Sequence, residues 1–244
     1  LKPIVYTITP FTTTRCFEQI RVDACYHNVN VIIIGTGSGL SYASLGPTHH
    51  SLEDLAIFRV LPHMTILAPA DEVELRFALR EALKVKGPVY IRIGKKGEKV
   101  VSSIQNGFKI GKSINHQTGK DIAFVASGTV LPNVLEAAKL INQKGFSCNV
   151  DSFHTIKPLD ESSLDKIFSK FKNICVVEEH SKIGGMFGAV SEWYAKSKFK
   201  DKNILSFGTP DEFMHEVGSQ DYAREKYGLS ADKIFKESIK LLIK

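Results

Sequence analysis

Short runs of aliphatic and β-branched residues alternate along the chain with longer stretches whose apolar positions recur at helical spacing. In the first half, this pattern predicts strands at 3–8, 29–35, 64–69 and 89–93, and helices near 12–26, 52–61 and 71–85. These strands are apolar on both faces, which is typical of a parallel sheet covered by helices on each side. Asp71 is expected to cap the third helix, with Glu72 and Glu74 complementing the positive end of its first turn.

The periodicity breaks between residues 94 and 120, where Gly, Ser, Asn and Lys predominate, and this segment predicts a crossing between two domains. A second series follows, with strands at 121–127, 148–153, 174–178 and 204–207 and helices near 131–144, 160–171, 185–196 and 231–242. The predicted fold class is therefore α/β, with two doubly wound domains at 1–114 and 115–244.

Composition excludes several classes of protein. The chain has 244 residues, of which 43% are hydrophobic and 24% charged, so it is expected to fold. No apolar stretch approaches the about 20 residues that a membrane-spanning helix needs, and no membrane partner is predicted. The net charge of +6 comes from Lys, Asp and Glu that alternate through the helices, which favours a solvated surface over nucleic-acid binding. The start at Leu1, without an initiator Met or signal-peptide pattern, predicts a missing N-terminus.

The four cysteines are scattered, at positions 16, 25, 148 and 175. They form no CxxC pair, which disfavours both a disulfide framework and a zinc ribbon. A reducing cytoplasm is the expected compartment.

The segment 35–51, GTGSGLSYASLGPTHHS, is long for a connection between a strand and a helix. It lies where open α/β sheets bind ligands, beyond the carboxyl end of a strand. Its adjacent His49 and His50 suit proton transfer near neutral pH, although glycines that only permit turns and solvated histidines would give the same pattern. A dinucleotide site is not predicted, because the third glycine of GTGSG comes one residue too early and no helix follows directly.

Several separated motifs carry a family resemblance. In the first half these are FTTTRCFEQIRVDACYHNVNV, LGPTHHSLEDLAIFRVLPHMTILAPAD and GPVYIRIGK. Together they resemble the pyrimidine-binding domain of the transketolase family, whose members use thiamine diphosphate. Four segments of the second half are similar to the C-terminal domain of the same family: DIAFVASG, HTIKPLD, CVVEEHSKIGG and PDEFMHEVGSQDYAREKYGLSADKI. The resemblance covers essentially the whole chain in the right order.

The resemblance implies roles for four side chains. Phe11 would pack against the aminopyrimidine ring of the cofactor. His49, in the GPTH motif, would be catalytic and would donate a hydrogen bond to a substrate oxygen that gains negative charge. Lys95 stands where sugar-phosphate transketolases place an arginine, and would contact a substrate phosphate as a point charge. His50 is a supporting candidate for substrate binding.

Departures from the family pattern change the expected substrate and partner. Leu45 replaces an aspartate that hydrogen-bonds a sugar hydroxyl, which favours an unusual sugar or a 2-oxo acid. The chain contains no GDG motif, with which the family holds the cofactor pyrophosphate through a divalent metal. The resemblance therefore implies a partner subunit that carries GDG and the Mg²⁺ ligands, no metal ligand in this chain, and self-association. The family's catalytic glutamate falls before Leu1.

The predicted function is the transfer of a two-carbon ketol unit from a ketose to an aldose by a two-component enzyme. Two alternatives stay open, the β subunit of a 2-oxo acid dehydrogenase and a non-catalytic subunit that has kept the fold. His154 stands where related synthases carry an arginine, and a surface histidine is an equally good interpretation. Glu178 and Glu179, at the end of a strand, are interpreted as structural interface residues.

Overall fold

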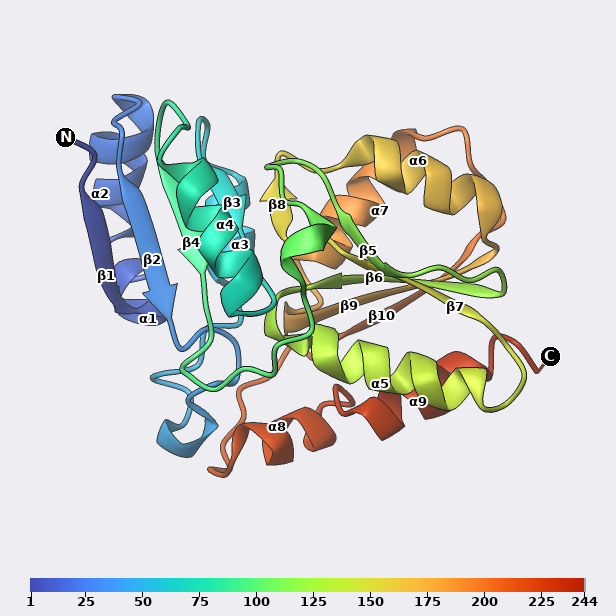
Figure 1. Cartoon of the computed structure of the whole chain (residues 1–244). Helices are drawn as coiled ribbons and strands as arrows, with labels where there is room; N and C mark the ends of the chain where they lie inside the picture. Colours follow the sequence, from blue (N-terminus) through green and yellow to red (C-terminus); the bar gives the residue numbers. More distant parts are fainter. Residues whose placement is uncertain (244) are drawn as a thin grey trace.

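The computed structural model describes residues 1–243 and contains two lobes, each built around a five-stranded sheet with helices packed on it (Figure 1). Most strand pairs are parallel, so the predicted α/β class is confirmed. Within the described residues, no helix combines the length and apolar character that a membrane crossing requires. All four cysteines are free.

The sheet of the N-terminal lobe has the strand order β1-β2-β4-β3-β8. Its four parallel strands are close to the predicted ones: β1 (Ile4–Ile8), β2 (Ile32–Thr36), β3 (Thr65–Leu67) and β4 (Val89–Arg92). β2 is buried along its whole length, as expected for a strand with neighbours on both edges and apolar residues on both faces. The fifth strand, β8 (Thr155–Lys157), comes from the second half of the chain and runs antiparallel to β3.

The prediction of one continuous helix at 12–26 is wrong, because residues 13–16 form a turn. A short helix, α1 (Thr9–Thr12), is separated by a turn from a second helical stretch, in which α2 (Phe17–Gln19) continues directly into the π-helix η1 (Ile20–Tyr26). The hydroxyls of Thr13 and Thr14 donate to the carbonyls of Thr9 and Pro10, at 2.7 and 2.9 Å. Such side-chain bonds compete with the backbone ladder and interrupt the helix.

The other helices of this lobe follow the prediction more closely. They are α3 (Asp54–Arg59) and α4 (Glu72–Ala82). Asp71 caps α4 as expected, accepting from the backbone N–H groups of Val73 and Glu74 at 3.1 and 3.0 Å. A 3₁₀ turn, η2 (Ala43–Leu45), lies between β2 and α3, and a second one, η3 (Ile104–Asn106), lies in the crossing segment.

The sheet of the C-terminal lobe has the order β10-β9-β6-β7-β5. Its strands are β5 (Ile114–Gln117), β6 (Ile122–Ser127), β7 (Cys148–Ser152), β9 (Asn173–Ser181) and β10 (Asn203–Thr209). Its helices are η4 (Gly128–Val130), α5 (Leu131–Asn142), α6 (Glu161–Lys170), α7 (Met186–Lys196), α8 (Gln220–Lys226) and α9 (Ala231–Ile239). The sequence pattern missed β5, β8 and α8. β5 and β8 lie at the edges of their sheets and lack a continuous apolar run, and α8 has too few apolar positions to define a period.

One of the hydrophobic clusters in the described part of the chain contains residues of both lobes. Phe58 and Tyr90 of the first lobe and Phe153 and Val176 of the second belong to it, all buried. The two lobes therefore share part of their core, and side chains at the junction are fixed from both sides.

Candidate functional site

The segment that the sequence singled out forms a loop at the carboxyl end of the N-terminal sheet. We call residues 37–51 the histidine loop. At its start, the backbone N–H groups of Gly37 and Ser38 donate to the carbonyls of Gly94 and Ile93, at 3.1 and 3.0 Å. At its neck, Gly39 and Ser51 exchange two backbone hydrogen bonds of 2.9 and 3.1 Å. The loop is thus anchored next to β4 and closed on itself.

One glycine of the loop is required by the packing of an aromatic ring. Gly37 has a φ of +70°, and a Cβ at this position would lie 1.9 Å from the ring of Tyr42. A side chain is therefore excluded here both by conformation and by contact. The close approach holds the Tyr42 ring against the start of the loop.

Three aromatic side chains gather beside the loop. The rings of Phe11 and His49 meet edge to face, with 5.5 Å between their centroids, and Tyr42 lies 6.2 Å from His49. Two cations border them: the Arg15 guanidinium lies 4.2 Å from the centroid of the Phe11 ring, and Lys95 Nζ lies 4.9 Å from that of Tyr42. We call these five residues the site cluster.

The side chains of the site cluster are all partly or fully accessible. Phe11, Tyr42 and His49 are half-buried, whereas Arg15 and Lys95 are exposed. The Nδ1 atom of His49 lies 2.9 Å from the Thr48 hydroxyl, which leaves Nε2 as the ring nitrogen for a ligand. The cluster therefore combines an aromatic surface, an imidazole and two positive charges.

The structure brings Phe11, His49 and Lys95 together and places His50 elsewhere. His50 is buried and lines a separate cavity of about 360 Å³ between the histidine loop and the segment after β10. Burial lowers the pKa of His50, and its Nε2 has no hydrogen-bond partner. Other residues that line this cavity include Leu52, Thr209, Phe213 and Met214.

Sequence reasoning missed Arg15 and Tyr42. Tyr42 lies within the segment that attracted attention for its histidines, and Arg15 follows the threonine run after Phe11. Nothing in the spacing alone indicates that these side chains border the same site, because α1 and the loop meet only in the folded chain.

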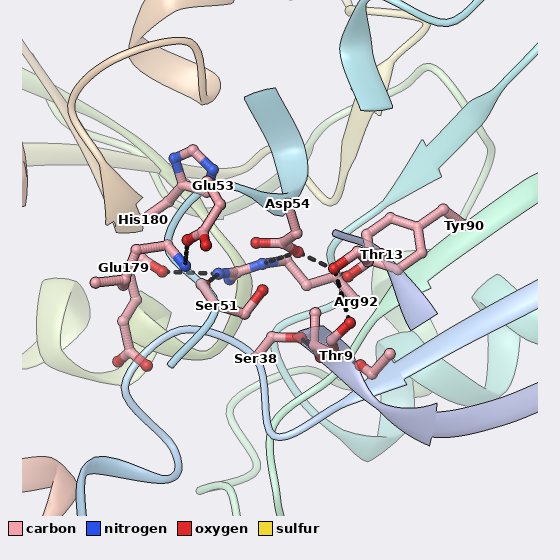
Figure 2. Close-up of polar contacts among 12 residues, drawn as sticks. Thr9, Thr13, Ser38, Ser51, Glu53, Asp54, Tyr90, Arg92, Glu179 and His180 are labelled. Atoms are coloured by element: carbon pink, nitrogen blue, oxygen red, sulfur yellow. Dashed lines mark hydrogen bonds and ion pairs between the residues drawn. The ribbon is translucent and has the colours of Figure 1, made fainter. Parts of the chain in front are cut away.

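A buried polar network lies beneath the histidine loop (Figure 2). Arg92, on β4, donates through Nε to Asp54 at 2.8 Å, and the Tyr90 hydroxyl donates to the same carboxylate at 2.7 Å. Burial alone would raise the pKa of Asp54, but the charge and hydrogen bonds of Arg92 hold it below its ordinary value. Burial and the neighbouring Asp54 carboxylate raise the pKa of Tyr90 well above its usual range.

The two glutamates at the end of β9 have different partners. Glu178 caps α7, accepting from the N–H groups of Met186 and Phe187 at 2.7 and 2.8 Å. Glu179 faces the N-terminal lobe and accepts from the backbone N–H of Leu40 at 2.7 Å. The interface interpretation is confirmed for Glu179, whereas Glu178 acts within its own lobe.

The surface interpretation of His154 is wrong. The side chain is fully buried and stacks on Phe108, with 3.8 Å between ring centroids. The segment that leads into β8 crosses to the first sheet, and this crossing carries His154 into the junction between the lobes. Burial lowers its pKa.

The site cluster fits one part of the expected cofactor. A half-buried Phe11 ring with Tyr42 nearby suits a planar heteroaromatic ring such as the aminopyrimidine. Among residues 1–243, no group of three or more His, Cys, Asp or Glu side chains is arranged to hold a metal ion. The rings of the site cluster thus have the chemistry that packs against the heterocycle of the cofactor.

Comparison with known proteins gives matches over both lobes. The family model "Transketolase, pyrimidine binding domain" matches residues 1–97, and "Transketolase, C-terminal domain" matches residues 111–234. The 6-deoxy-6-sulfo-D-fructose transketolase subunit SqwH of Clostridium sp. (strain MSTE9) is 32% identical over 232 residues, which cover 95% of this chain and 71% of the relative. An apulose-4-phosphate transketolase subunit of Phocaeicola vulgatus is 31% identical over 236 residues, covering 96% and 74%.

A solved structure extends the similarity to three dimensions. A split gene transketolase, described as an inactive beta4 tetramer, superimposes with a TM-score of 0.89 at 33% identity. The match covers 98% of this chain and 75% of that one.

Proposed function

The chain belongs to the transketolase family, and from this premise we propose that it is the C-terminal component of a two-component, thiamine-diphosphate-dependent transketolase. The observation that carries the proposal is the site cluster, in which Phe11, His49 and Lys95 converge at the carboxyl end of the N-terminal sheet. The proposed reaction transfers a two-carbon ketol unit from a ketose to an aldose.

Each side chain of the site cluster has a proposed role. Phe11 binds the face of the aminopyrimidine, as its half-buried ring allows. Bound thiamine diphosphate would supply the electron sink for cleavage of the carbon–carbon bond. His49, held through Nδ1 by Thr48, donates from Nε2 to the substrate oxygen that gains negative charge.

The cations of the site cluster support an anionic substrate. Arg15 lies over the ring of Phe11 and Lys95 over that of Tyr42, so each adds positive charge beside an aromatic ring that contacts His49. A lysine makes a point contact where an arginine would make a bidentate one, so phosphate binding through Lys95 is expected to be less selective. His50 is retained as a candidate for substrate binding from its separate cavity.

The proposed substrate is an unusual sugar. Leu45 is half exposed in the histidine loop and cannot hydrogen-bond a sugar hydroxyl. The names of two relatives contain 6-deoxy-6-sulfo-D-fructose and apulose-4-phosphate, a sulfonated and a phosphorylated sugar. We extend to this chain only the class of substrate, a modified sugar that carries negative charge.

The proposal requires a partner subunit with a GDG motif. Such a partner would hold the pyrophosphate through Mg²⁺, for which oxygen ligands are suited. Self-association of this chain is part of the proposal, with the site closed between this chain and the partner. We further propose that the chain divides into domains at 1–114 and 115–244. We also propose a cytoplasmic location, which the free cysteines favour.

The decisive experiment mixes the full-length chain with the GDG-bearing protein encoded beside it, with Mg²⁺ and thiamine diphosphate. We expect the cofactor to raise the melting temperature of the mixture and to support ketol transfer between a ketose and an aldose. Oxidation of pyruvate with an artificial electron acceptor, without ketol transfer, would instead indicate the β subunit of a 2-oxo acid dehydrogenase. No stabilisation by the cofactor would indicate a non-catalytic subunit.

A further inference from the structure

We propose that Glu179, in the C-terminal lobe, is a positioning residue that holds the histidine loop and thereby places His49. The inference rests on the proposed function for the role of His49. The contact itself does not depend on that function, since it is a feature of the folded chain.

The carboxylate of Glu179 binds the backbone of the histidine loop directly. Its Oε1 accepts from the N–H of Leu40 at 2.7 Å, although Glu179 and Leu40 lie in different lobes. Both residues are buried, at 1% and 0% exposure. A buried N–H must have a partner, so this bond fixes the loop at one point along the chain.

The packing around Glu179 leaves little freedom for the loop. Gly39, with a φ of +64°, passes so close that a Cβ there would lie 2.5 Å from the Glu179 carboxylate. The side chains of Leu40 and Ala43 are buried within the hydrophobic cluster of the C-terminal lobe, which includes Phe124. Residues 39–43 of the loop therefore pack in the C-terminal lobe, whereas residues 37 and 38 are hydrogen-bonded next to β4 of the N-terminal sheet.

Helix α8 supports the carboxylate from the other side. The Nε2 atom of Gln220 donates to both carboxylate oxygens, at 2.9 and 3.2 Å, and lies 3.3 Å from the Ser41 hydroxyl. Arg224 forms an ion pair with the same carboxylate. The charge of Glu179 is thus compensated, and its orientation toward Leu40 is set by α8.

The backbone of Glu179 engages the other end of the loop through Arg92 (Figure 2). Nη2 of Arg92 donates to the carbonyl of Glu179 at 2.8 Å and to that of Ser51 at 3.0 Å. Ser51 is the last residue of the histidine loop. Glu179 therefore contacts the loop near both ends, directly at Leu40 and through Arg92 at Ser51, and His49 lies between these points.

The test compares Glu179→Ala with the matched control Glu178→Ala. Both glutamates are 1% exposed and adjacent, but Glu178 caps α7, and among the described residues its carboxylate forms no hydrogen bond or ion pair with the histidine loop. Hydrogen exchange of the isolated chain should show protection across 37–51 falling by about tenfold or more in Glu179→Ala. In Glu178→Ala, the loss should fall on the first turn of α7 and spare the loop.

Two further variants keep the test decisive. Glu179→Gln should recover much of the protection, because its amide oxygen can still accept from Leu40. If Glu179→Ala does not fold, Gln220→Ala removes one support of the carboxylate from the edge of α8 and should raise loop exchange by about threefold. Unchanged exchange at 37–51 in every folded Glu179 and Gln220 variant would overturn the proposal.

Turnover in the complex with the partner then tests the effect on His49. Glu179→Ala should lower kcat by about 10–100-fold with KM changed by less than about twofold, because a misplaced donor acts mainly on the transition state. Glu178→Ala should keep kcat within about twofold at a temperature where it is folded. Increased loop exchange without a fall in kcat would reject the positioning role. If the wild-type complex transfers no ketol unit, the proposed function fails, and the exchange result still decides the contact.

Discussion

The imidazole of His49 meets the ring of Phe11 edge to face at 5.5 Å. The two residues come from different elements, α1 and the loop that follows β2, which lie side by side because β1 and β2 are parallel neighbours. A ligand ring that packs on Phe11 therefore lies within reach of His49. This relationship gives the first two predictions.

Replacing His49 with alanine should lower turnover of the reconstituted enzyme by about 10²–10³, as the loss of one oxyanion donor does elsewhere. His49 is half-buried on a loop that is anchored at other residues, so the melting temperature should hardly change. Steady-state kinetics and a thermal melt of the same preparation check both parts. A variant with wild-type turnover would remove His49 from the site.

Phe11→Ala should weaken thiamine-diphosphate binding by the complex, because it removes the ring surface for the aminopyrimidine. A stacking contribution of about 0.5–1.5 kcal/mol corresponds to a Kd raised about 2–13-fold. Calorimetric titration of the complex measures this change, and Phe11→Tyr, which keeps the ring, is the matched control. Equal affinities for the alanine and tyrosine variants would contradict a stacking role.

Arg92→Ala and Asp54→Ala should each lower the free energy of unfolding by about 3–5 kcal/mol, because each leaves its partner charge buried and unpaired. Asp54 is 0% exposed and Arg92 is 5% exposed, so water cannot replace the lost partner. Denaturant unfolding measures the loss. The double variant Arg92→Ala/Asp54→Ala should cost less than the sum of the two single variants, because it leaves neither charge of the pair buried and unpaired. Additive losses would show that the two side chains act independently.

Stability should fall as the pH is lowered from about 7.5 to about 5.5. Burial lowers the pKa of His50 and His154, so the folded chain resists protonation at these sites. The unfolded chain takes up protons near the ordinary histidine pKa of about 6.5, and the equilibrium therefore shifts toward unfolding below that pH. Melting temperatures across this range measure the effect. His50→Gln should flatten the profile, and a profile that stays as steep as that of the wild type would contradict a contribution from His50.

The spacing of apolar residues within each segment predicted the main strands and helices, because a buried element carries enough apolar positions to define its period. Two of the elements that sequence reasoning missed differ in cause. β8 is three residues long and depends on pairing with a strand far away in the chain. α8 carries local helix signals, with Ser219 as its cap, Asp221 in its first turn and Lys226 in its last, but a search for apolar periodicity does not detect them.

The positions of the predicted site residues can be compared with the structure, although their roles stay predictions. Phe11, His49 and Lys95 lie in motifs that the family resemblance identifies, and the structure brings them together around Tyr42. The different direction of His50 follows from the way the loop is seated on the C-terminal lobe. His49 and His50 are adjacent in the sequence, but the path of the loop backbone directs them to different places, His49 to the site cluster and His50 to a separate cavity.

β8, a strand from the second half of the chain that completes the N-terminal sheet, makes the two lobes depend on each other structurally. Lys157, at the end of β8, donates to the carbonyls of Arg59 and Leu61 at 2.9 and 2.6 Å, so this short strand also closes the end of α3. A chimaera that joined the first lobe to a foreign second lobe would have to inherit a fitting β8, or leave Ile66 and Leu67 along a bare sheet edge. Gene fission or recombination that separated the lobes would therefore destabilise the first one, and we expect both lobes to be inherited together.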